Sequence, residues 1–234
     1  MSSLSIIVPV LDEASGIAEA LTALTHFRRH GAEVVVVDGG SRDGTPDLAR
    51  PFADQLLAAP QGRAAQMNAG AAQARGDVLL FLHADTRLPA DADRLIVEGL
   101  ASSRRAWGRF DVVIGGRHPL LALIAYLMNL RSRWTGIATG DQAMFMTRTA
   151  FDRAGGFPDL PVMEDVALSS RLKRFGRPLC LKRRVVTSGR RWEQNGVIRT
   201  ILLMWRLRLA YFFGVHPAAL ARRYGYVPRS ERTH

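Results

Sequence analysis

The sequence predicts an α/β fold built on a mostly parallel β-sheet. Short apolar runs without polar alternation are typical of strands that helices cover on both faces. Segments with helical spacing separate these runs, as in the alternating β-α units that form parallel sheets. The runs are Leu4–Val10, Glu33–Asp38 with its four consecutive valines, and Asp77–His83.

The remaining elements follow from spacing, caps and turn residues. In the first half we expect helices over Gly16–Arg28, Pro46–Arg50 and Gln61–Ala74, and a short strand over Gln55–Ala58. In the second half we expect helices over Ala90–Ser102, Pro119–Arg131, Glu164–Phe175 and Gly196–Phe213, and strands over Trp107–Ile114, Gln142–Thr147 and Leu179–Val186. No linker is long enough to mark a second domain. We therefore expect one domain over residues 1–192, with residues 193–234 as a basic, apolar helical extension packed on it.

Composition and charge narrow the class of protein. The chain has 234 residues, of which 47% are hydrophobic and 23% charged, as in ordinary globular domains. Its single cysteine excludes an internal disulfide framework and fits a reducing compartment. The start resembles no signal peptide and no apolar run approaches the roughly 20 residues of a membrane span, so we expect a cytoplasmic protein.

Positive charge is concentrated near the C-terminus. The net charge is +11, and residues 171–234 hold 16 of the 32 Lys and Arg but only two acids, Glu193 and Glu231. Such a segment indicates an anionic partner, which can be a phosphorylated substrate, an acidic membrane surface or nucleic acid. A codon bias toward arginine explains the same charge without a partner.

Carboxylates follow three of the predicted strands. Asp12 and Glu13 follow the first, Asp38 the second, and Asp85 the fourth. Each alone can be a helix cap or a turn residue, but parallel strands bring their carboxyl ends to one edge, where ligands of such sheets bind. His83 and Asp85 point to the same side of an extended chain and can together hold a divalent cation and, through it, a diphosphate.

Other residues suggest acid–base and phosphate chemistry. Glu164 and Asp165 open a helix, where capping is the simpler explanation and a general base the functional one. Arg63 begins a helix after a glycine and can meet phosphate oxygens. Arg190, Arg191 and Trp192 follow a strand, either as a solvated basic face or as clamps on a departing diphosphate.

Several common sites are excluded. No Gly-Lys-Ser/Thr follows the glycine-rich segments, and no Gly-x-Gly-x-x-Gly follows the first strand, which argues against P-loop and NAD sites. The remaining histidines lack metal-ligand spacing, and no serine is paired with a histidine in a recognisable catalytic arrangement.

Taken together, these motifs resemble the family 2 glycosyltransferases of GT-A fold, over residues 1 to about 192. The segments that carry the resemblance are Ile6–Glu13, Val36–Thr45, Phe81–Thr86, Gly155–Phe157 and the pair Glu164-Asp165. The chain also resembles a small bacterial subgroup without membrane spans, of the radical-SAM/selenodomain-associated type.

The resemblance implies an inverting transfer of a sugar from a nucleotide-diphospho-sugar to an acceptor hydroxyl. It implies Asp165 as the base with Glu164 as second choice, and a divalent cation, Mg²⁺ or Mn²⁺, on Asp85 with His83. The donor, most simply a UDP-sugar, would be bound by Pro9, Asp12, Glu13, Asp38, Gly39, Ser41, Arg63, Ala84, Asp85, Asp141, Arg190, Arg191 and Trp192.

Three positions depart from the family pattern. Gly39 stands where a second Asp is usual, His83 replaces the first Asp of Asp-x-Asp, and Ser188 replaces the Gln of the Gln-x-x-Arg-Trp element. A site with one Asp and one His is less anionic than one with two Asp, and it tolerates a softer ion such as Mn²⁺.

Alternatives stay open at this point. One is a nucleotidyltransferase on a similar sheet, and another is a non-catalytic basic module for nucleic acid or membrane, although clustered carboxylates repel nucleic-acid phosphates. The apolar segments Pro119–Arg131 and Gly196–Phe213 suggest contact with a lipid-linked acceptor or with the inner face of a membrane. Core packing or a homodimer explains them equally well.

Overall fold

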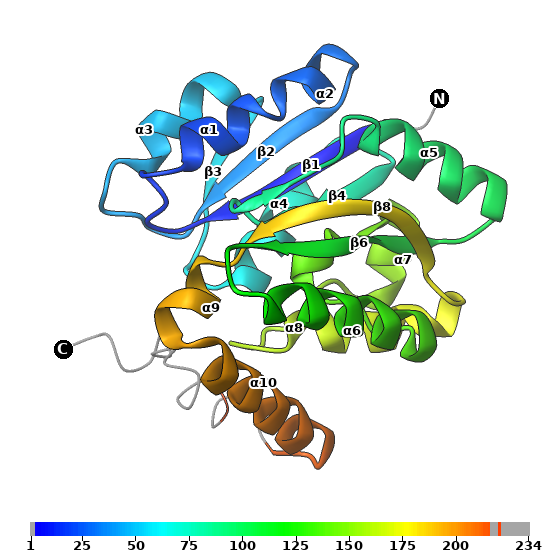
Figure 1. Ribbon diagram of the computed structural model, residues 1–234. Coiled ribbons are helices and arrows are strands. Elements are labelled where there is room, and N and C mark those ends of the chain that lie inside the picture. Colours follow the sequence, from blue (N-terminus) through cyan, green and yellow to red (C-terminus); the bar gives the residue numbers. More distant parts are fainter. Residues whose placement is uncertain (1–2, 216–219, 221–234) are drawn as a thin grey trace.

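A computed structural model describes residues 3–215 and 220 and shows one mixed sheet between two layers of helices (Figure 1). The strands of the described part are ordered β3-β2-β1-β4-β7-β6-β8-β5. They are β1 (Leu4–Val10), β2 (Glu33–Asp38), β3 (Gln55–Ala58), β4 (Val78–Phe81), β5 (Thr86–Arg87), β6 (Trp107–Gly115), β7 (Phe145–Thr147) and β8 (Leu179–Ser188). The pairs β1–β2, β1–β4, β2–β3 and β6–β8 are parallel, whereas β7 runs antiparallel to β4 and β6, and β5 to β8.

Alternate residues of the central strands enter two apolar cores. One contains Ile6 and Val36, under α1 (Ile17–Thr22), α2 (Thr25–Arg29), α5 (Ala92–Ser103) and α6 (Leu120–Thr135). The other contains Ile7 and Val37, under α4 (Arg63–Gln73), α7 (Arg148–Ala154) and α8 (Glu164–Leu172). The continuous apolar runs of the sequence are explained by this cover on both faces.

The remaining helices are the short α3 (Thr45–Ala49) and α9 (Arg190–Asn195), the long α10 (Val197–Phe212), and three 3₁₀ turns, η1 (Arg50–Phe52), η2 (Gly140–Gln142) and η3 (Lys173–Phe175).

Helix α4 lies unusually close to the sheet. A Cβ added at Gly70 would lie 2.5 Å from Ile7 Cγ2 and 2.9 Å from Val37 Cγ2, so only glycine allows this approach. The close packing fixes the N-terminus of α4, which carries Arg63, next to the carboxyl ends of β1 and β2.

The predicted fold class is confirmed, but some elements differ. The helix expected over Gly16–Arg28 is two helices, α1 and α2, because the chain turns after Thr22, whose hydroxyl donates to the Ala18 carbonyl and favours a bend. The short β5, α7 and α9 were not expected. Helix α7 depends on a cap, since the Thr147 hydroxyl accepts the Ala150 N–H at 3.2 Å.

The C-terminal part of the described chain packs on the same domain. Val197 joins the core under α6, and Leu207 packs with Val162 and Leu220 in a separate small cluster. Helix α10 lies below the body of the domain in Figure 1, beside the N-terminal loop of α8 that it contacts. In the described residues no helix is long and apolar enough to cross a bilayer.

Candidate active site

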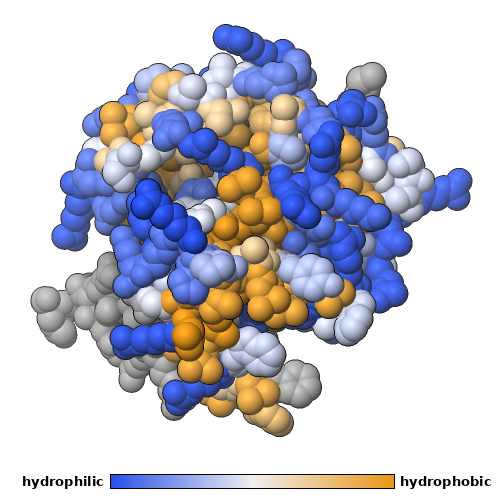
Figure 2. All heavy atoms as spheres, viewed as in Figure 1, coloured by the Kyte–Doolittle hydropathy of each residue, from blue (hydrophilic) through white to orange (hydrophobic). Residues whose placement is uncertain are grey.

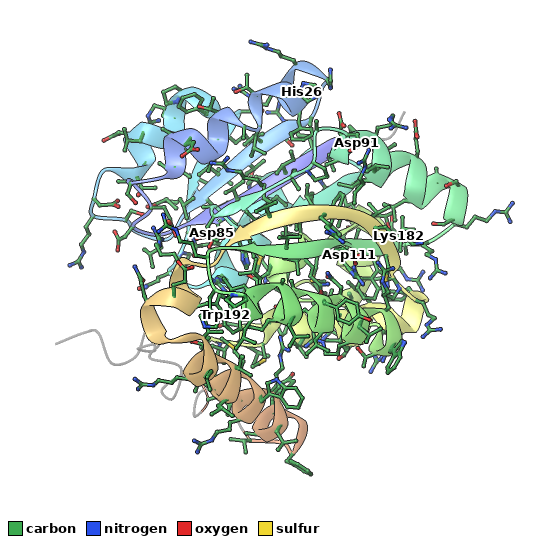
Figure 3. The ribbon with its side chains drawn as sticks, viewed as in Figure 1. His26, Asp85, Asp91, Asp111, Lys182 and Trp192 are labelled. Carbon is green, nitrogen blue, oxygen red and sulfur yellow. The ribbon has the colours of Figure 1, made fainter. Side chains whose placement is uncertain are left out.

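A cavity of about 440 Å³ lies at the carboxyl ends of β1 and β4, bordered by α4, α8 and α10. Its volume lies within the range of small-molecule sites. The structure brings ten of the predicted residues to its wall: Pro9, Glu13, Arg63, His83, Ala84, Asp85, Asp141, Glu164, Asp165 and Trp192. Figure 3 labels Asp85 and Trp192, which mark this end of the sheet. A second hollow continues past Glu13 and Asp85 to Arg190.

Four of the six predicted residues outside the cavity wall, Asp12, Asp38, Gly39 and Ser41, lie in the loop after β2 and in the neighbouring loop after β1. The Asp38 carboxylate accepts the N–H groups of Gly40 and Ser41, at 2.9 and 3.1 Å, and the Ser41 hydroxyl. The Asp12 carboxylate accepts the Arg42 N–H at 2.9 Å, and Asp12 adopts a φ of +53°. Both carboxylates, with Gly39 and Ser41, therefore hold the loop that borders the site.

Gln66 is a site residue that the sequence did not reveal. Its buried side chain donates to the carbonyls of Val10 and Val37, each at 2.8 Å, and it lines the cavity. The amide thereby bonds to carbonyls at the carboxyl ends of β1 and β2 and ties α4 to both strands. In the sequence Gln66 looks like any polar residue of a helix, so no signal identified it.

Glu13 and Asp85 face the same space from different strand ends. Both line the cavity and the hollow beside it. Burial, then the negative charge of Asp85, raises the pKa of Glu13, while Arg190 and Arg63 oppose the rise. A bound cation would reduce the repulsion between these two carboxylates.

The donor atoms fit a hard divalent cation in part. Mg²⁺ is commonly held by one or two carboxylates together with substrate phosphates and water. Asp85 and Glu13 can provide the two carboxylates. Among the described residues no group of three or more His, Cys, Asp and Glu is arranged to hold a metal ion. The remaining ligands would therefore have to come from a phosphorylated substrate and water.

His83 contacts the turn η2 with both ring nitrogens. Its Nδ1 lies 3.4 Å from Asp141 Oδ1, and a Cβ at Gly140 would overlap its Nε2. The imidazole thus fixes Asp141 and requires glycine at position 140. Burial would raise the pKa of Asp141, but the hydrogen bond and charge of His83, with Arg63 and Arg208, outweigh it and hold that pKa below its usual value.

Glu164 and Asp165 begin α8 and differ in environment. The Asp165 carboxylate accepts the N–H of Gly140 at 2.8 Å and that of Val166 at 2.7 Å, which fixes its direction in the cavity. Glu164 is only 6% exposed, and burial, then the charge of Asp165, raises its pKa to about 7. The preceding Met163 has a φ of +68°, a strained conformation of the kind that is frequent at functional sites.

Asn68 ties α4 to the loop before α8, because its amide exchanges two hydrogen bonds with the Phe157 backbone.

Cations flank these carboxylates on several sides. Arg63 comes from α4 and Arg208 from α10, and both line the cavity, whereas Arg190 lines only the adjoining hollow. The Arg191 side chain lies outside the described residues. The arginines of α10 interrupt an apolar sequence, but only the fold shows that Arg208 faces the site.

The comparisons with known proteins agree with this arrangement. Residues 5–156 match the family described as Glycosyl transferase family 2, so the chain belongs to the family 2 glycosyltransferases. It is 35% identical over 155 residues to an undecaprenyl-phosphate 4-deoxy-4-formamido-L-arabinose transferase of Pseudomonas fluorescens, covering 58% of this chain and 44% of the relative. It is 39% identical over 150 residues to a PGL/p-HBAD biosynthesis glycosyltransferase of Mycobacterium bovis, covering 60% and 54%. The chain thus spans about half or less of the length of these relatives.

Solved structures show the same fold. A mannosyltransferase of Pyrobaculum calidifontis in complex with GDP-Man and Mn²⁺ matches with a TM-score of 0.65 and 25% identity, over 96% of this chain and 65% of the other. The Staphylococcus aureus TarS fragment 1–349 matches with a TM-score of 0.64 and 19% identity, over 80% and 60%. The fold is that of the GT-A glycosyltransferases, as predicted.

Proposed function

We propose that this chain catalyses the inverting transfer of a glycosyl group from a nucleotide-diphospho-sugar to an acceptor hydroxyl. The observation that supports this most strongly is that one cavity is lined by the carboxylates of Asp85 and Glu13 and also by the fixed carboxylate of Asp165. The carboxylates of Asp85 and Glu13 suit the cation of a bound diphosphate, and the carboxylate of Asp165 suits a general base. Membership of the family supports the same reaction over nucleotidyl transfer or a non-catalytic basic module.

The donor is proposed to lie along the carboxyl ends of β1, β2 and β4. The loops of Asp12 and Asp38 border the nucleoside end, with Pro9, Gly39 and Ser41, and Ala84 approaches the diphosphate. Arg63 and Arg190 are proposed to meet the phosphates from two sides, with Trp192 near them, and a phosphate-binding role for Arg191 remains a prediction. A UDP-sugar is our first choice, and solved neighbours with UDP-GlcNAc and with GDP-Man show that this fold accepts either base.

Asp85 is proposed as the main cation ligand, with Glu13 as a second carboxylate. When bound, the cation would stabilise negative charge on the leaving diphosphate. A metal-binding role for His83 remains a prediction, and its contacts with Asp141 and Gly140 favour an orienting role. A neighbouring structure contains Mn²⁺, which fits this choice of ion.

Asp165 is proposed to accept the proton of the acceptor hydroxyl. Backbone N–H groups of Gly140 and Val166 donate to its two oxygens and so fix the direction of the carboxylate. The carboxyl of Glu164, with its pKa near 7, carries a proton below that pH and limits repulsion beside Asp165. The hydroxyl then attacks the anomeric carbon from the face opposite the diphosphate, which inverts the centre and releases the nucleoside diphosphate.

The acceptor is proposed to be lipid-linked, because one relative is named for undecaprenyl phosphate and because α6 and α10 expose apolar side chains. A cytoplasmic location with peripheral contact at the inner face of a membrane follows from the same proposal. Membership of the radical-SAM/selenodomain-associated subgroup and a homodimer remain predictions.

Thermal-shift measurements with a panel of nucleotide-sugars, each with Mg²⁺ and with Mn²⁺, test the proposal. A true donor raises the melting temperature by mass action, with an increase of about 3 kcal/mol in stability at a hundredfold excess over Kd. Stabilisation by nucleoside triphosphates with release of pyrophosphate would instead indicate a nucleotidyltransferase. Binding of DNA or anionic vesicles without any nucleotide-sugar would indicate the binding module.

A further inference from the structure

The turn η2 presents three consecutive residues to the cavity, Thr139, Gly140 and Asp141. The Gly140 N–H donates to Asp165 Oδ2 at 2.8 Å, so the direction of the proposed base depends on where the turn lies. A displacement of about 1 Å at a catalytic group is enough to slow a reaction about a hundredfold. The groups that hold η2 in place are therefore important for the proposed transfer.

Gln142 ends η2 and is a fully buried amide. Its Oε1 accepts the Thr139 N–H at 3.2 Å, and its Nε2 donates to Asn129 Oδ1 at 3.3 Å. The next residue, Ala143, has a φ of +46°, a conformation that persists where the surrounding structure fixes it. Gln142 thus closes the turn on one side and ties it to α6 on the other.

The orientation of the Gln142 amide is set from β6 through Asn129. The Asn129 amide donates to the Val112 carbonyl and accepts the Val112 N–H, each at 2.9 Å, so the backbone of β6 determines where its oxygen and nitrogen lie. The Asn129 oxygen then requires the NH₂ group of Gln142, which leaves the Gln142 oxygen for Thr139. Through these two amides the strand fixes the turn.

Helix α8 holds the segment before η2 from the other side. Ser169 lies one helical turn after Asp165 and is fully buried. Its hydroxyl accepts the Ala138 N–H at 3.1 Å and donates to the Ala138 carbonyl at 3.2 Å. The helix that carries the proposed base is therefore bonded to the segment that leads into the turn.

Stability alone does not require polar groups at these positions. Helix α6 packs Leu121 and Met128 in the core and exposes Leu123, Leu127 and Trp134. Figure 2 shows apolar side chains gathered over the lower part of the molecule, where α6 and α10 lie. Replacing a buried hydrogen-bonded pair with apolar groups of the same shape is often nearly neutral for stability. A pair of amides between α6 and η2 therefore indicates a need for a defined position of the turn.

We propose that Gln142 and Ser169 are positioning residues for the proposed base. They hold η2 between β6 and α8, so that the Gly140 N–H directs the Asp165 carboxylate into the cavity. Neither side chain lines the cavity, and both act through the turn. This inference rests on the proposed glycosyl transfer and adds two residues to its machinery.

Hydrogen exchange of the Gly140 amide, followed by NMR in the ligand-free full chain, tests the hold on the turn. Gln142→Met keeps the length of the side chain and removes both of its hydrogen bonds, and Ser169→Ala removes the second tie. We expect the Gly140 amide to exchange at least about tenfold faster in each variant, and by a larger factor than the Val36 amide in the core of β2. Equal factors for the two amides would indicate a merely structural role and would overturn the inference.

Gln55→Met is the matched control, with the same substitution at the start of β3. It removes hydrogen bonds from the Gln55 amide to the Glu33 carboxylate and to the Gln73 carbonyl, away from η2. We expect the Gly140 amide of this variant to exchange as in the wild type. Exchange as fast as in Gln142→Met would show that any lost amide loosens the turn, which would overturn the inference.

The catalytic effect is measured with the nucleotide-sugar that raises the melting temperature most, as release of nucleoside diphosphate with water as acceptor. We expect kcat to fall about ten- to hundredfold in Gln142→Met and about tenfold in Ser169→Ala. The Kd of UDP with Mn²⁺, measured by calorimetry, should stay within twofold of the wild-type value. Wild-type kcat in Ser169→Ala, which is nearly isosteric and keeps the test decisive if Gln142→Met does not fold, would overturn the inference.

The Asp165→Asn background shows whether the effect passes through the base. Added to Asp165→Asn, Gln142→Met should lower the residual rate less than about twofold, because the group that it positions is already lost. A further tenfold loss would place the effect elsewhere and would overturn the inference. Absence of nucleotide-sugar binding and turnover in the wild-type protein would instead contradict the proposed function, and the exchange of the Gly140 amide would still test the hold on η2.

Discussion

Glu164 provides a stability test of the electrostatics at this site. The pKa of Glu164 is raised from 4.5 to about 7 by burial and by Asp165. The folded protein thus binds this proton more tightly than the unfolded chain does, so the stabilising contribution is complete below about pH 4.5 and is lost as the pH rises through about 7. A shift of roughly 2.5 pKa units, at about 1.4 kcal/mol each, corresponds to roughly 3.5 kcal/mol.

The substitution Glu164→Gln removes the titration while it retains shape and polarity. We expect the variant and the wild type to have similar stability near pH 4.5, and the variant to gain roughly 3.5 kcal/mol relative to the wild type by pH 8. Urea denaturation followed by tryptophan fluorescence, at steps of one pH unit, measures this difference. Glu98→Gln on the exposed face of α5 is the control, and its stability should run parallel to that of the wild type. Parallel curves for Glu164→Gln and wild type would refute the argument for a buried, protonated Glu164.

Three other predictions concern catalysis and packing. Asp165→Asn should lower the rate of transfer, measured by product formation, about a hundredfold or more. The Kd of the donor, measured by calorimetry, should stay within a few fold of the wild-type value. Loss of donor binding would refute the assignment of Asp165 as the base. Gly140→Ala should push His83 and the N–H that Asp165 accepts out of place, so kcat should fall more than melting temperature does, and unchanged kcat would contradict the contact. Gly70→Ala should destabilise the fold by about 1–3 kcal/mol, because the new methyl group meets Ile7 and Val37. Gly16→Ala is the control and should not destabilise the fold, because the space around Gly16 is open. Equal effects of the two substitutions in urea denaturation would refute the close packing of α4.

The sequence predicted the centre of the fold well because both faces of that sheet are covered. The bounds of β1, β2 and β3 agree with the expected ones, since continuous apolar runs between turn residues have few other structures open to them. The break between α1 and α2 and the short helices α7 and α9 were missed. They depend on single hydroxyl contacts or on tertiary packing, which leave little trace in residue spacing.

For the site, the sequence identified the residues of strand ends better than those of distant helices. Glu13, Asp85 and Asp165 could be expected together because parallel strands share one edge and because their motifs resemble a family. Arg208 and Gln66 could not be found in this way, since only helix packing brings them to the cavity. The departure at His83 is clarified by its contacts with Asp141 and Gly140, which a sequence motif does not show.

The proposed transfer depends on the binding of a diphosphate to Asp85 through a divalent cation. The most direct measurement is a crystal structure with UDP and Mn²⁺, in which anomalous scattering locates the ion. We expect Mn²⁺ in coordination contact with the Asp85 carboxylate and with the diphosphate, and no bound ion when Asp85→Ala is crystallised in the same way. A diphosphate held in the cavity without an ion on Asp85, or Mn²⁺ bound away from Asp85, would show that Asp85 does not bind the diphosphate through a cation.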